Sequence, residues 1–170
     1  MSGDYIIPPV DALDGPVAIR DRLLRECPEF AHLAEGEARI AFLLASVEVI
    51  KAGKQILGAA HLPTVQGQLK GVFAWTLEQA LGFMPDFLIT LDLTFWEEAD
   101  ARHREILVYH ELCHCIQKAD RDGEPRFDED DRPVWGIVGH DVEEFSATVR
   151  RYGAYSEDIR EFIAAASGGE

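Results

Sequence analysis

The sequence has few cysteines, no long apolar run and little positive charge, and each shortage argues against a class of protein. Three cysteines in 170 residues are too few for a disulfide framework, so we expect a reducing cytoplasm. No apolar run reaches the roughly 18 residues that a membrane span needs, so we expect no membrane partner. Residues 1–9 lack a basic start followed by an apolar core, and we therefore expect no signal peptide.

The shortage of positive charge is the strongest bias in the composition. Only 16 Lys and Arg residues stand against 31 Asp and Glu residues, and the formal net charge is -15. Because nucleic-acid binding needs clustered Lys and Arg, we expect no nucleic-acid partner. Solubility is the simplest explanation of the charge, and a sharper interpretation is an acidic surface that binds a basic partner.

In other respects the composition is that of a globular domain, with 47% apolar and 28% charged residues. We expect one domain over residues 1–170, with an extended arm at 1–16 and a disordered tail at 167–170. The apolar patterns predict helices at 17–25, 37–51, 100–118, 141–152 and from Ser156 onward. They predict strands at 54–63 and 86–96, with a turn-rich connection at 119–139. The expected fold class is α+β, with a small mixed or antiparallel sheet packed on helices.

The helix predicted at 100–118 carries the motif His110-Glu111-x-x-His114. Residues four apart on a helix lie on the same face, so both imidazoles can point at one metal ion. Glu111 lies about 100° around the helix from His110 and about 60° from His114, close enough to reach a water on that metal. Two nitrogen ligands beside a carboxylate base are the arrangement that zinc-dependent hydrolysis needs.

A catalytic zinc ion needs a third protein ligand and one open position for water. His140 is the only histidine after His114, and it follows a segment with glycines at both ends, residues 136–139, that could approach the site closely. We favour His140 as the third ligand. The alternatives are the carboxylates of the next predicted helix, Glu144 and then Glu143.

Three other side chains bear on this site. Asp141 suits the cap of the next helix, or a hydrogen bond that orients a ligand histidine. Cys113 lies about 60° from His110, and a thiolate there would fill the open position; we expect Cys113 and Cys115 to pack as small apolar side chains instead. Tyr152 is the tyrosine best placed to stabilise the oxyanion of a tetrahedral intermediate.

Three segments, residues 84–92, 107–117 and 133–145, resemble the phage metallopeptidase domain family, a zincin-like group of phage and prophage genomes. The resemblance covers roughly residues 54–153. Its most distinctive part is Gly-His-Asp-Val-Glu-Glu-Phe at 139–145, because His-Glu-x-x-His occurs in many unrelated peptidases. The resemblance implies a zincin-like fold and zinc dependence, and it supports His140 as the third ligand.

We therefore interpret the chain as a zinc metallopeptidase, most simply an endopeptidase, that acts on peptide or protein substrates. His110, His114 and His140 would hold Zn²⁺, and Glu111 would be the general base. The strand within 87–95 would pair with an extended substrate. One alternative is a catalytically inactive zinc-binding phage interaction protein that binds a basic host factor. Another is a zinc hydrolase of a different class, although the Cys-x-x-Cys pattern of deaminases is missing.

Overall fold

The computed structural model describes residues 4–51, 53–140 and 146–167. The chain divides into two compact units, residues 1–138 and residues 139–170. The single domain expected over residues 1–170 stays a prediction. Within the expected N-terminal arm, residues 5 and 6 form a short strand, and the expected tail lies outside the described residues from 168 onward.

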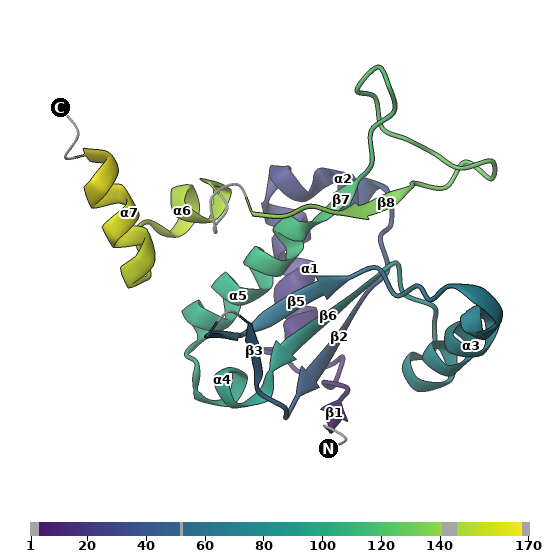
Figure 1. Ribbon diagram of the computed structural model, residues 1–170, viewed down its shortest axis with the longest axis horizontal. Helices are drawn as coiled ribbons and strands as arrows, with labels where there is room; N and C mark the ends of the chain where they lie inside the picture. The colour runs from purple at the N-terminus through teal and green to yellow at the C-terminus, as the bar shows by residue number, and fades with distance from the viewer. Residues whose placement is uncertain (1–3, 52, 141–145, 168–170) are drawn as a thin grey trace. The chain divides into compact units, whose positions relative to one another are not determined.

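The first unit is built around a four-stranded sheet (Figure 1). In order across the sheet, its strands are β1 (Tyr5–Ile6), β2 (Ile40–Ala45), β6 (Phe87–Asp92) and β5 (Gly58–His61). β2 and β6 are parallel, while β1 and β5 each run antiparallel to their neighbour. The sheet is therefore mixed, and β5 is one of its two edges in the part of the chain that the structure describes. The α+β class expected from the sequence is confirmed.

Two helices cover one face of this sheet, α1 (Pro16–Glu26) and α5 (Ala101–His114) (Figure 1). Alternate residues of β6, namely Phe87, Ile89 and Leu91, are fully buried. Leu91 pairs with Gly58 of β5, and Gly58 faces α5, so this buried row points toward the helices. Burying each such side chain contributes about 1.5–3 kcal/mol, and the core therefore fixes α5 against the sheet.

The other elements of the first unit are short. Its remaining helices are α2 (Ala31–Glu35), α3 (Lys70–Leu81) and α4 (Leu93–Glu98), with the 3-10 helices η1 (Pro28–Phe30) and η2 (Gly67–Leu69). Two hairpins pair β3 (Val49–Lys51) with β4 (Lys54–Ile56), and β7 (Cys115–Gln117) with β8 (Trp135–Ile137). The second unit contains α6 (Ser146–Tyr152) and α7 (Glu157–Ser167). Among the described residues, no helix is both long enough and apolar enough to cross a membrane.

The helix predicted at 37–51 is wrong, because these residues form β2 and β3. The run from Ile40 to Ala45 is continuously apolar, and such a run fits a buried strand as well as a buried helix. Parallel pairing with β6 decides in favour of the strand. Gly53 lies in the turn of the β3–β4 hairpin, with a φ of +78°.

Two predicted elements end earlier than expected. β6 stops at Asp92, whose carboxylate accepts a hydrogen bond from Phe95 N at 2.7 Å and caps α4. α5 stops at His114, because residues 115–117 pair with β8 instead. The prediction that the strand within 87–95 pairs with an extended substrate is also wrong. β6 lies inside the sheet, and its two edges are hydrogen-bonded to β2 and β5.

Asp92→Ala is expected to lower the free energy of unfolding by about 1–2 kcal/mol. Asp92 is buried, and besides capping α4 it accepts a hydrogen bond from Gln55 Nε2 at 3.3 Å. Urea denaturation measures the loss. The matched control is Asp11→Ala, at an exposed aspartate, which should change stability by no more than about 0.5 kcal/mol. Equal losses in the two variants would contradict the capping role of Asp92.

Candidate metal centre

α5 carries two histidines whose rings lie side by side. The ring centroids of His110 and His114 are 5.2 Å apart, with an angle of 73° between the ring planes. The helix begins at a cap, where Asp100 accepts a hydrogen bond from His103 N at 2.8 Å. That bond, together with one from the His103 ring, lowers the pKa of Asp100. Capped at its start and packed into the core, α5 is a rigid support for the two imidazoles.

The β7–β8 hairpin brings a distant segment back to the end of α5. Val138 N donates to His114 O at 3.0 Å, and His114 Nδ1 lies 2.6 Å from Val138 O. A carbonyl oxygen can only accept a hydrogen bond, so Nδ1 of His114 carries a proton. The lone pair of the neutral ring is then on Nε2, which is the tautomer that binds a metal through Nε2. Residues 135–138 therefore return to the C-terminal end of α5, while their part in a metal site stays a prediction.

His140 follows Val138 by two residues, and two extended residues span at most about 7 Å. Ligand atoms from His110, His114 and His140 all lie within 4.8 Å of one another. Three imidazoles are a ligand set that zinc accepts, and they also suit copper, iron and nickel. These three histidines could therefore hold a metal ion.

Glu111 lies on the inner side of α5, with only 2% of its surface exposed. Its carboxylate packs against β5 at Gly58, where a Cβ atom would lie 2.5 Å from Glu111 Oε1. The side chain is held between α5 and the edge strand. The residue that follows His110 therefore carries a carboxylate that is shielded from bulk water.

The cysteines and the nearest tyrosine belong to the packing around α5. Cys115 is 1% exposed, its Sγ donates to Glu111 O at 3.5 Å, and burial raises the pKa of its thiol. Cys113 is half-buried, and the histidine cluster includes no cysteine among the described residues. Tyr109 is fully buried and donates a hydrogen bond to Glu29. Burial and this bond hold the pKa of Tyr109 well above its usual range.

The structure does not test the roles predicted for the site residues of the segment from Asp141 to Tyr152. Asp141, Glu143 and Glu144 lie outside the described residues. Tyr152 is the last residue of α6, and its hydroxyl accepts a hydrogen bond from Arg151 Nε at 3.1 Å. Its role as an oxyanion stabiliser stays a prediction.

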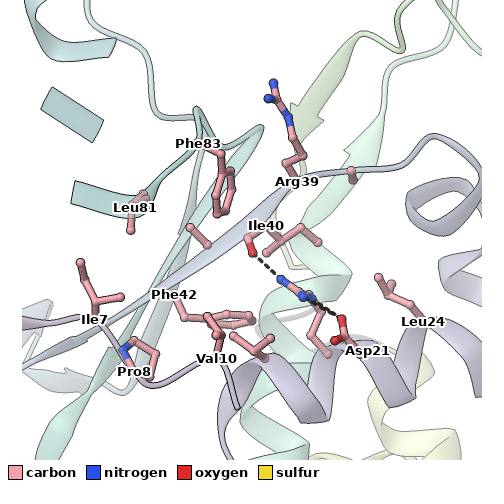
Figure 2. Close-up of a pocket in the computed structure, with 14 residues that line it drawn as sticks. Ile7, Pro8, Val10, Asp21, Leu24, Arg39, Ile40, Phe42, Leu81 and Phe83 are labelled. Atoms are coloured by element: carbon pink, nitrogen blue, oxygen red, sulfur yellow. Dashed lines mark hydrogen bonds and ion pairs between the residues drawn. The ribbon is translucent and has the colours of Figure 1, made fainter. Parts of the chain in front are cut away.

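A pocket of about 460 Å³ lies elsewhere in the first unit, between α1, β2 and the end of α3 (Figure 2). Apolar side chains such as Leu24, Phe42 and Phe83 line it. Arg20 reaches into it, donating to Ile40 O at 2.5 Å and to Asp21 Oδ1 at 2.7 Å. None of the three clustered histidines lines this pocket, so it is separate from the candidate metal centre.

Sequence reasoning missed two residues that shape the centre. Gly58 lies within the strand predicted at 54–63, and an isolated glycine in a strand pattern is a signal for close approach by another group. Val138 lies within the segment 136–139 that is expected to approach the site. The hydrogen bond between its carbonyl oxygen and the His114 ring cannot be predicted from the sequence, because any residue could supply that carbonyl.

The fold and the clustered histidines define a class: an α+β protein with a candidate metal centre on a helix. The model of the family described as "Putative phage metallopeptidase" matches residues 17–167. The chain belongs to this family, which confirms the resemblance noted in the sequence. The family implies a metal cofactor and peptide or protein substrates. No curated protein and no solved structure matches the chain at a significant level.

Proposed function

We propose that the protein is a zinc-dependent peptidase with a zincin-like arrangement, in which His110, His114 and His140 hold the metal. The observation that carries the proposal is the cluster of ligand atoms from these three histidines within 4.8 Å. The hydrogen bond between His114 Nδ1 and Val138 O supports it further, because metal-binding histidines usually donate their other ring N–H in this way. Three protein ligands would leave one position for water, as in catalytic rather than structural zinc sites.

Bound zinc would supply positive charge that acidifies a water molecule and polarises the scissile carbonyl group. Glu111 would accept the proton of that water as it attacks the carbonyl carbon, and would then pass the proton to the leaving amine. Its burial suits this role, because a carboxylate shielded from bulk water acts in a low-dielectric site. Tyr152 would donate a hydrogen bond to the oxyanion.

We place the substrate on β5 rather than on β6. β5 pairs with β6 along one edge only among the described residues, and its Gly58 faces Glu111. An extended peptide could add to its other edge through backbone hydrogen bonds, which give affinity with little dependence on sequence. The small side chains of Ala59 and Ala60 would let the peptide backbone come close.

Metal removal tests the proposed function. Treatment with a zinc chelator is expected to abolish cleavage of a mixed fluorogenic peptide library, and one equivalent of zinc per chain should restore it. The measurement is initial rate against added zinc, with magnesium as the control ion. Cleavage that persists after complete removal of zinc would contradict the proposal. If the zinc-loaded chain cleaves nothing yet binds a basic protein, the interaction protein becomes the better interpretation.

A further inference from the structure

We propose that Gly58 is a positioning residue for the reaction, because its missing side chain makes room for the Glu111 carboxylate. This inference rests on the proposed function and deepens it. It assigns a role to a residue of the edge strand that binds neither the metal nor the proton. Gly58 would act only through Glu111.

The contact is tighter than any side chain at position 58 would allow. A Cβ atom there would lie 2.5 Å from Oε1, 2.9 Å from Cδ and 3.0 Å from Cγ of Glu111. Carbon atoms in optimal contact are about 3.5–4.0 Å apart, so an added methyl group would have to displace the carboxyl group or the strand. Both partners are held: Gly58 pairs with Leu91 in the sheet, and Glu111 lies within α5.

The need for glycine at this position comes from Glu111 rather than from the backbone. The glycines of the described residues that have a positive φ are Gly53, Gly67, Gly82, Gly123 and Gly153. Gly58 is not in that set, so its backbone conformation is open to other residues. Glycine also weakens a strand, because it loses more conformational entropy and packs no side chain. The three nearest atoms to the missing side chain all belong to Glu111.

The consequence is a specific functional defect. Alanine at position 58 would push the carboxylate away from the place where it meets the attacking water. A displacement of about 1 Å in a catalytic group can cost about 10²-fold in rate. The three atoms nearest to the new methyl group all belong to Glu111, so the expected defect is in the carboxylate rather than in the histidine ligands.

The test compares Gly58→Ala with Gly71→Ala in the full chain. A Cβ atom at Gly71 would meet no atom within 4 Å apart from the backbone of its own helix, and the φ of Gly71 is not positive. Gly71 is therefore the matched control. Gly58→Ala is expected to lower kcat by about 10²-fold with little change in KM and with zinc affinity unchanged. Gly71→Ala should keep the wild-type kcat. A Gly58→Ala enzyme with wild-type kcat would overturn the proposal.

A second readout needs no activity. In the metal-free protein, Gly58→Ala should lower Tm by on the order of 5 °C, because overpacking costs about 1–3 kcal/mol. In the Glu111→Ala background the same substitution should cost nothing, because the Cγ, Cδ and Oε1 atoms are gone. If Gly58→Ala alone does not fold, recovery of folding in the double variant is the expected result. An equal loss in both backgrounds, or failure of both to fold, would overturn the proposal.

This pair of readouts separates the two proposals. If the zinc-loaded wild type cleaves no peptide, the proposed peptidase function fails on its own. The Tm comparison then still reports whether Gly58 makes room for Glu111, since it requires neither zinc nor a substrate.

Discussion

Glu111→Gln is expected to leave zinc bound and to reduce peptide hydrolysis by about 10³-fold. Glutamine has nearly the shape of glutamate, so it fits the same space between α5 and Gly58. Its amide cannot accept the proton of the attacking water, and the reaction loses its general base. The measurement is kcat for a peptide substrate, together with the zinc content of the purified variant by inductively coupled plasma mass spectrometry.

The control is Glu98→Gln, at an exposed glutamate of α4, which should keep the wild-type rate. Two outcomes carry different meanings. Loss of zinc in Glu111→Gln would show that Glu111 supports the metal site rather than proton transfer. Full activity with zinc bound would remove Glu111 from the proposed mechanism.

His140→Ala is expected to weaken zinc binding by on the order of 10²–10³-fold, because it removes one of three protein ligands. The side chain belongs to the cluster of ligand atoms with His110 and His114. Competition with a fluorescent zinc chelator measures the affinity. The rate of peptide hydrolysis at subsaturating zinc should fall with it.

The matched controls address the alternatives left open by the sequence. His103→Ala removes an exposed histidine of the same helix, and it should keep wild-type affinity. Glu143→Ala and Glu144→Ala should each retain most of the zinc affinity. If His140→Ala binds zinc as tightly as the wild type while Glu144→Ala or Glu143→Ala does not, the third ligand is a carboxylate of that segment.

The part of the site that depends on local geometry could be predicted from the sequence. His110 and His114 share one side of a helix because the helical repeat places residues four apart together, whatever the rest of the chain does. The return of residues 136–139 toward α5 was also predictable, because a turn-rich connection as long as 119–139 in a compact domain usually has a functional role. In the structure, Val138 indeed reaches His114.

The parts that depend on pairing between distant strands could not be predicted. The residues of β2 became a strand because β6 was there to pair with them, although their apolar run fits a helix equally well. The strand predicted at 86–96 has the β-branched and aromatic residues that suit a buried strand, and β6 indeed lies inside the sheet. A segment whose residues strongly favour a buried strand is therefore a poor candidate for an edge strand. The segment Gly58–His61 has a weaker strand pattern, and it forms the edge of the sheet.

X-ray absorption at the zinc edge of the loaded protein tests the central claim most directly, because it counts and identifies the atoms bound to the metal. The ligand set of His110, His114 and His140 predicts three imidazole nitrogens at about 2.0–2.1 Å, one oxygen, and no sulfur. A Zn–S shell at about 2.3 Å would mean that a thiolate, with Cys113 the nearest in sequence, occupies the position needed for water. That result, or a spectrum with only two imidazoles, would contradict the account.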